Sequence, residues 1–155
     1  MIVRAATEAD AGRISVLCGQ LGYPSSTEEA LRRLRIIFQA PAHAAYVAQE
    51  EKSGNVVGWV HVFVPRLLVS DSQAEIGGLV VDEGLRGRGV GRMLMRQAEE
   101  WALARGCRAI RLRSNIVREG AHHFYERLGY SRLKTQTVFR KPLAPESAAT
   151  EKTAP

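Results

Sequence analysis

The sequence predicts an α/β fold, and three features support this prediction. Residues 74–81 are apolar and rich in β-branched side chains, as expected of a strand. Residues 90–105 carry apolar side chains at helical spacing, and a glycine-rich turn joins the two segments. Strand-like runs and helical patterns follow one another through the rest of the chain, which is typical of a sheet covered by helices.

The length and composition indicate one ordinary globular domain. The chain has 155 residues and a formal net charge of +6. We expect the domain to span residues 1–141, and residues 142–155, rich in proline, alanine, serine and threonine, to form a flexible tail. Cys18 and Cys107 are isolated and lack the spacing of a metal site, so we expect reduced thiols and no bound metal.

The N-terminal part predicts a strand followed by two helices. Residues 2–5 form a short strand, and Thr7 with Asp10 can cap a helix that ends at Gly22. The serines at 25–26, each with a glutamate three residues later, can cap a second helix with an apolar stripe.

The next part predicts strands at residues 44–49 and 56–64. The second of these is apolar on both faces, so we expect it to be central in the sheet. It contains His61, which is either a hydrogen-bonded core histidine or a catalytic one. In the strand that follows, two adjacent glycines at 77–78 predict a bulge or a close approach of another backbone or a ligand.

The C-terminal part predicts a strand at residues 108–113 and a helix from about 118 to 129. Tyr125 lies on the apolar stripe of that helix and is either a core aromatic or a functional group. Residues 131–134 and 135–140 are expected to be the last strands.

The turn at residues 86–91 is the clearest candidate binding site. Its sequence is Arg86, Gly87, Arg88, Gly89, Val90 and Gly91. Because it opens directly into a helix, several N–H groups without intrahelical partners would point at one spot, at the positive end of the helix dipole. Such a spot binds phosphate. Eight arginines against two glutamates between residues 86 and 113 give a local charge of +6, which favours a compact polyanion as the ligand.

Other interpretations of this turn fit less well. The glycines could simply let the strand and the helix pack closely. The spacing G-x-G-x-G departs from the dinucleotide fingerprint, and no lysine follows as in a P-loop. The basic residues lack the interleaved aromatics of a nucleic-acid platform, so we expect no nucleic-acid partner.

The turn resembles the acetyl-CoA-binding segment of the GCN5-related N-acetyltransferase (GNAT) family. The family signature Arg/Gln-x-x-Gly-x-Gly/Ala is matched by Arg86, Gly89 and Gly91. The resemblance continues at residues 124–130, which match the ending Phe-Tyr-Glu-x-Leu-Gly-Tyr/Phe of a later segment. From residue 2 to about 140 the chain follows the family's order of elements and is similar to its small, bacterial-type, single-domain members.

The resemblance implies a mixed, mostly antiparallel sheet of six or seven strands with helices on both faces. A splayed parallel pair, residues 74–81 and 108–113, would bind acetyl-CoA. The cofactor contacts implied are Leu79, Val80, Val81, Arg86, Gly87, Arg88, Gly89, Val90, Gly91, Arg92 and Asn115. Many members place the asparagine seven residues before the tyrosine; Arg118 occupies that position here, so either Asn115 or Arg118 would contact the cofactor.

The resemblance also implies catalytic roles. The N–H of Leu79 would donate to the oxyanion, and Tyr125 would be the general acid that protonates the leaving thiolate. Glu75, the only acid in its strand, would be the general base, sharing strand parity with Leu79 unless a bulge shifts the register. Glu75 could instead be solvated or paired with an arginine, in which case His61 or water would take the proton.

We therefore expect an N-acetyltransferase that moves the acetyl group of acetyl-CoA to a primary amine of a small molecule, by direct attack in a ternary complex. The alternatives are a non-catalytic acyl-CoA-binding sensor and an enzyme that acetylates a protein amino group. The sequence has no apolar leader and no run of 18 apolar residues, so we expect a cytoplasmic protein with no membrane partner. It leaves the oligomeric state open, a homodimer included.

Overall fold

The computed structural model describes residues 1–145, and its contacts divide the chain into two compact units. The first unit is Met1–Arg113 and the second begins at Ser114. The expected single domain of residues 1–141 stays a prediction. Most of the expected tail, residues 146–155, lies outside the described residues.

The first unit is built on one sheet with the strand order β1-β2-β3-β4-β5. The strands are β1 (Ile2–Ala5), β2 (His43–Gln49), β3 (Val56–Phe63), β4 (Ala74–Val81) and β5 (Ile110–Leu112). Neighbours from β1 to β4 are antiparallel, and β4 and β5 are parallel. The expected mixed, mostly antiparallel sheet is confirmed, with β3 in its centre.

The number of strands differs from the expectation, because the described residues form five strands rather than six or seven. The predicted strands at 131–134 and 135–140 have no regular secondary structure. Leu133, Val138 and Phe139 are 82%, 86% and 91% exposed. An apolar alternation becomes a strand only when a neighbouring strand takes up its main-chain hydrogen bonds and a packed surface buries one of its faces.

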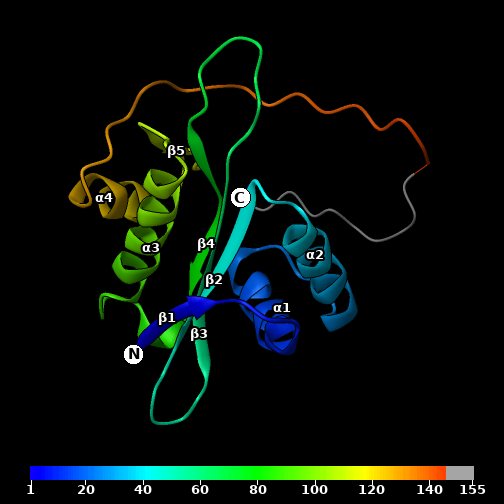
Figure 1. The fold of residues 1–155 in the computed structure, drawn as a ribbon, viewed down its shortest axis with the longest axis vertical. Helices are drawn as coiled ribbons and strands as arrows, with labels where there is room; N and C mark the ends of the chain where they lie inside the picture. The colour runs from blue at the N-terminus through cyan, green and yellow to red at the C-terminus, as the bar shows by residue number, and fades with distance from the viewer. Residues whose placement is uncertain (146–155) are drawn as a thin grey trace. The chain divides into compact units, whose positions relative to one another are not determined.

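Helices cover both faces of this sheet. The helices of the first unit are α1 (Ala11–Leu21), α2 (Thr27–Gln39) and α3 (Val90–Ala104). Figure 1 shows α3 on one face and α1 with α2 on the other. Short 3₁₀ turns, η1 (Glu8–Asp10) and η2 (Glu83–Leu85), precede α1 and α3.

The helix ends follow the predicted capping signals. The carboxylate of Asp10 accepts a hydrogen bond from the N–H of Thr7 at 2.8 Å, and Arg4 donates to both of its oxygens. Ser26 caps α2 by accepting from the N–H of Glu29 at 3.1 Å. The left-handed φ of +95° at Gly22 ends α1, as a glycine after the last turn allows.

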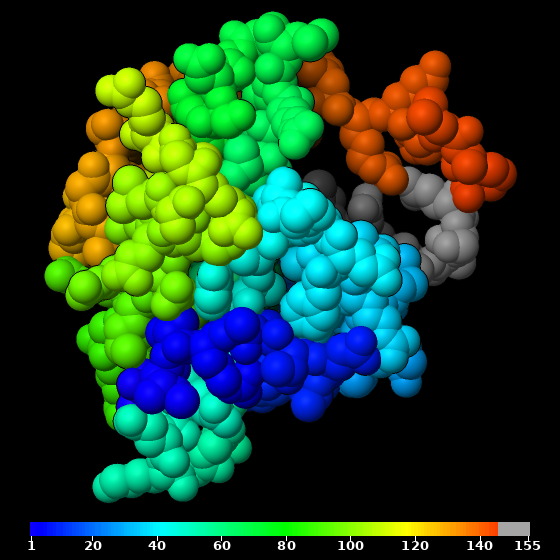
Figure 2. Space-filling model, in the orientation of Figure 1, coloured from blue at the N-terminus to red at the C-terminus, as the bar shows by residue number. Residues whose placement is uncertain are grey.

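The core has a layer on each side of the sheet. Leu17 and Leu34 of α1 and α2 belong to one buried cluster with Val47 and Val80 of the sheet. On the other face, α3 packs on β3 through a buried stripe. The stripe consists of Val90, Leu94, Met95, Ala98, Trp101 and Ala102. The hairpin turns at the two ends of β3 protrude from this core at opposite ends of the unit (Figure 2).

The second unit contains α4 (Glu119–Arg127). The helix stops as predicted at Gly129, which has a φ of +93°. The N–H of Tyr130 returns to the carbonyl of Tyr125 at 3.1 Å, so the end of the helix is closed by a main-chain bond.

Candidate functional site

The predicted bulge in β4 is confirmed. Val62 pairs with Ile76 and His61 pairs with Gly78, so Gly77 is an extra residue with no partner of its own in β3. A bulge of this kind breaks the ladder and re-aims the side chains on either side of it.

The rings of His61 and Trp59 in β3 leave no room for side chains at the two glycines of the bulge. A Cβ at Gly77 would lie 2.5 Å from Nδ1 of His61, and a Cβ at Gly78 would lie 2.7 Å from Cη2 of Trp59. Real side chains essentially never show contacts this short. The absence of side chains at the bulge therefore lets His61 and Trp59 pack directly on the backbone of β4.

The bulge changes which residues share a face of the sheet. Glu75 is opposite Phe63, and these side chains lie on the same face as His61, whereas Leu79 is opposite Val60 on the other face. Glu75 and Leu79, two residues of equal parity, therefore point to opposite faces, because the extra residue shifts the register.

The parallel strand pair opens after three residues. Pairing between β4 and β5 ends with Ile76 and Leu112, although β4 continues to Val81. Among the described residues, no strand pairs with residues 77–81 on the side where β5 has ended. This is the main-chain segment to which we assigned the contacts of Leu79, Val80 and Val81.

The glycine turn enters α3 with the predicted geometry. Gly87 and Gly89 have φ angles of +77° and +84°, and Gly89 is the N-cap of the helix. The N–H of Met93 donates to the carbonyl of Gly89 at 3.1 Å. The earlier N–H groups, from Val90 to Arg92, precede the first intrahelical bond and are free to bind an anion.

The side chains around this turn leave its main chain accessible. A Cβ at Gly87 or Gly89 would meet nothing within 4 Å, so these glycines are required by their backbone angles and not by crowding. Arg86 folds back, its Nε donating to the carbonyl of Val81 at 3.3 Å. Arg88 and Arg92 are exposed, which keeps two further cations beside the turn.

Glu75 is buried, with 7% of its surface exposed, and is paired with two arginines of the neighbouring chain segment. Nε of Arg111 donates to its Oε2 at 2.9 Å, and Nε of Arg113 lies 3.6 Å from its Oε1. Arg111 is also its register partner across the parallel pair. Pairing of Glu75 with an arginine was the alternative that the sequence analysis gave to its role as the general base.

His61 is held by a second histidine that sequence reasoning missed. Nδ1 of His43 and Nε2 of His61 are 3.0 Å apart, and the two rings stack with centroids 5.3 Å apart. Phe63 stacks on both rings, at 5.1 and 5.5 Å. Burial and, to a lesser extent, the proximity of His43 lower the pKa of His61 from 6.5 to about 4, so its ring is neutral at physiological pH.

The remaining predicted residues lie in the second unit. The ring of Tyr125 makes edge contacts with Phe124 and Tyr130, and burial raises the pKa of its hydroxyl while Arg118 opposes the rise. The hydroxyl is therefore protonated at neutral pH and able to donate. Oδ1 of Asn115 accepts from the N–H of Val117 at 3.3 Å, which gives that side chain a structural partner.

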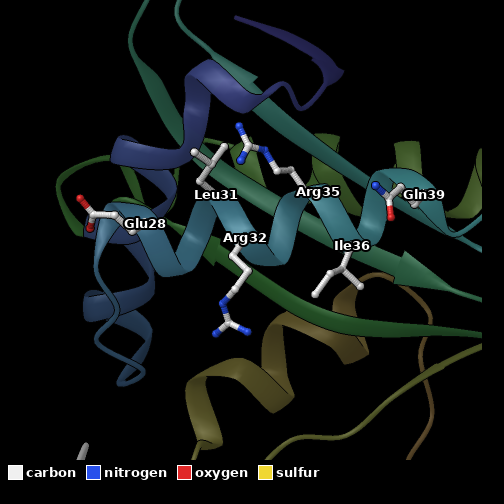
Figure 3. Close-up of a pocket in the computed structure, with 6 residues that line it drawn as sticks. All are labelled: Glu28, Leu31, Arg32, Arg35, Ile36 and Gln39. Carbon is white, nitrogen blue, oxygen red and sulfur yellow. The ribbon is translucent and has the colours of Figure 1, made fainter.

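A separate hollow of about 400 Å³ lies along α2 (Figure 3). Its lining consists of Glu28, Leu31, Arg32, Arg35, Ile36 and Gln39. All six residues come from one helix, and none was predicted to be functional. We assign it no role in catalysis.

Within residues 1–145, no helix is both long and apolar enough to cross a membrane. The same residues contain no group of three or more histidine, cysteine, aspartate or glutamate side chains placed to hold a metal ion.

Comparison with known proteins identifies the type of enzyme. The acetyltransferase (GNAT) family model matches residues 14–130. The chain is 27% identical to an aminoglycoside N(6')-acetyltransferase type 1 from Stenotrophomonas maltophilia, over 94% of this chain and 95% of that one. It is 35% identical to the uncharacterized N-acetyltransferase YhdJ of Bacillus subtilis, over 75% and 80% of the two chains. Two other curated relatives match over shorter stretches, and the chain spans 25% and 52% of their lengths.

A solved structure shares the fold at lower sequence identity. It is AAC(6')-Iy in complex with the bisubstrate analog CoA-S-monomethyl-acetylneamine, with a TM-score of 0.79 and 19% identity. The alignment covers 91% of this chain and 97% of the other. The likeness confirms the predicted α/β fold with its parallel strand pair.

Proposed function

The chain belongs to the acetyltransferase (GNAT) family as an acetyl-CoA-dependent N-acetyltransferase, and we propose that its acceptor is the primary amine of a small molecule. The match to the family model is the evidence for the type of reaction, acetyl transfer to an amine. The full-length similarity to an aminoglycoside N(6')-acetyltransferase supports a small-molecule amine over a protein amino group.

The early end of the β4–β5 pairing is the observation that supports acetyl-CoA binding most directly. The main chain of residues 77–81 is left without a β5 partner, and the glycine turn follows along the same chain. An extended pantetheine arm can pair with such a strand edge. The pyrophosphate would then meet the first N–H groups of α3, with Arg88 and Arg92 beside it.

Acetyl transfer needs a neutral amine, a stabilised oxyanion and a proton for the departing thiolate. We propose that the N–H of Leu79 donates to the thioester oxygen and that the hydroxyl of Tyr125 protonates the thiolate. The raised pKa of Tyr125 means that its hydroxyl carries a proton at neutral pH, as a general acid must.

A panel of amines incubated with acetyl-CoA tests this function. Released CoA thiol is measured, and the acetylated amine is identified by mass. The panel should include an aminoglycoside, a polyamine, free amino acids and a lysine peptide. Acetylation of small amines is expected. Tight acetyl-CoA binding without thioester cleavage would instead indicate a sensor, and acetylation of the peptide alone would indicate a protein acceptor.

A further inference from the structure

The bulge of β4 and the histidine pair form one assembly. The absence of a side chain at Gly77 lets the imidazole of His61 lie with Nδ1 against the β4 backbone. Its other nitrogen, Nε2, is 3.0 Å from Nδ1 of His43. The two ring nitrogens of His61 therefore have separate environments, one at the bulge and one at a fixed partner.

The position of His61 relates it to the reacting atoms. It pairs with Gly78, and the next pair along the strands is Val60 with Leu79, whose N–H is the proposed oxyanion donor. Nδ1 of His61 thus faces the β4 backbone within two residues of that donor. Stacking on Phe63 and on His43 keeps the ring from turning away.

The charged groups on this face favour His61 over Glu75 as a proton acceptor. The face carries Glu75, Arg111 and Arg113, and both carboxylate oxygens of Glu75 are already engaged by guanidinium groups. An incoming ammonium group would have to displace an arginine from a partly buried ion pair. The neutral ring of His61 has no competing cation on its Nδ1 among the described contacts.

Building on the proposed function, we propose that His61 is the general base that deprotonates the acceptor ammonium at its Nδ1, and that His43 positions it. His43 accepts a hydrogen bond at its own Nδ1 from the Nε2–H of His61. This bond fixes the tautomer in which Nδ1 of His61 carries the lone pair and faces the bulge.

The proton and electron balance of the step is complete. The ammonium loses one proton to Nδ1 of His61, and the amine nitrogen attacks the thioester carbon. The C–N bond forms, the attacking nitrogen loses its second proton to solvent, the C–S bond breaks, and the thiolate takes a proton from Tyr125. Solvent then removes the proton from His61 and returns one to Tyr125, so each turnover releases one proton.

The test compares two amines of nearly equal size, ethylamine and 2,2,2-trifluoroethylamine. At neutral pH ethylamine is almost entirely ammonium, whereas electron withdrawal by fluorine leaves trifluoroethylamine largely as the free base, which needs no base catalyst. We expect His61→Asn to lower the ethylamine rate about 100-fold or more and the trifluoroethylamine rate only a few fold. Acetyl-CoA affinity, measured by calorimetry, should be unchanged.

Variants at His43 test whether this residue positions the ring of His61 through its hydrogen bond or only packs against it. The side-chain oxygen of His43→Asn can take the place of Nδ1 and should keep most of the ethylamine rate, whereas His43→Leu should lose it as His61→Asn does. Glu75→Gln is the competing variant: if it alone shows the ethylamine-selective loss, His61 is not the base. Equal losses on both amines in His61→Asn would also overturn the proposal, because they indicate a structural role.

The controls distinguish this proposal from the proposed function. If the wild-type protein acetylates neither these two amines nor any in the panel, the proposed function fails and this inference fails with it. If it acetylates ethylamine and His61→Asn is as fast as wild type, only the inference fails.

Discussion

The half-buried imidazole of His61 should make the stability of the protein depend on pH, and one substitution should remove this dependence. Its pKa is lowered from 6.5 to about 4 by burial. In the unfolded chain the same imidazole becomes protonated as the pH falls below 6.5. In the folded protein it becomes protonated only near pH 4. Stability is therefore unaffected at pH 7.5 and falls progressively as the pH drops through this window.

The size of the effect follows from the two pKa values. Each pKa unit of difference corresponds to about 1.4 kcal/mol, so the wild-type protein should lose at most about 1.4 kcal/mol at pH 5.5 and about 2.5 kcal/mol at pH 4.5. Both figures are the contribution of His61 alone. Carboxylates with a lowered pKa, such as Asp10 beside Arg4, also stabilise the folded protein. This stabilisation is lost only at lower pH, where the carboxylates become protonated in the folded state.

Urea unfolding at pH 7.5, 5.5 and 4.5 measures this dependence for the wild type and for His61→Asn. The difference in unfolding free energy at pH 7.5 contains the lost packing of the ring and serves as the baseline. The wild type should lose stability relative to the variant by the amounts above as the pH falls. His123→Asn is the control: the ring lies 3.5 Å from Glu126, but at an exposed position on α4, where an ion pair contributes little, so the variant should stay close to the wild type. Parallel curves for His61→Asn and the wild type would refute the burial argument.

Three further substitutions test the predicted site. Gly89→Asp should weaken acetyl-CoA binding at least about 100-fold in calorimetry, because a carboxylate repels phosphate at the helix N-terminus. Gly106→Asp has a similar positive φ and equally open surroundings, but it follows the other end of α3 and should bind normally; equal loss in both variants would count against the phosphate site. Tyr125→Phe should lower turnover by about 10²–10⁴-fold with acetyl-CoA affinity unchanged, and turnover within a few fold of wild type would leave Tyr125 a packing residue. Glu75→Gln should lower the free energy of unfolding by about 1–3 kcal/mol, because Arg111 loses a charged partner in a partly buried pair; an unchanged urea midpoint would contradict this.

Features set by local sequence were predicted correctly. The apolar stripe of α3, the capping box at Ser26 and the glycine stop at Gly22 depend on residues a few positions apart, and each is present. The bulge was also predictable, because two adjacent glycines inside an apolar strand leave a gap in its packing that a bulge or a closely approaching group fills.

Features that depend on pairing between distant segments were not predicted from the sequence. His43 meets His61 across the β2–β3 pair, and nothing in either strand specifies that register on its own. The nearer partner of Glu75 is Arg111, 36 residues later, and it was predictable only as an unspecified arginine. The predicted strands at 131–140 failed for the same reason, because alternation of side chains does not supply a partner strand.

The single extra residue in β4 determines which functional groups meet. If Gly77 were instead paired with Val62 in a regular ladder, Glu75 would lie opposite Val64 and would point to the face of Leu79 and Val60, which packs against α3. A carboxylate there would be buried against apolar side chains, because the buried stripe of α3 contains no cation to pair with it. With the bulge, Glu75 lies on the face of Phe63 and His61 and can pair with its arginines. The same insertion gives the ring of His61 direct access to the backbone beside Leu79, so the two roles proposed for this strand both depend on one glycine.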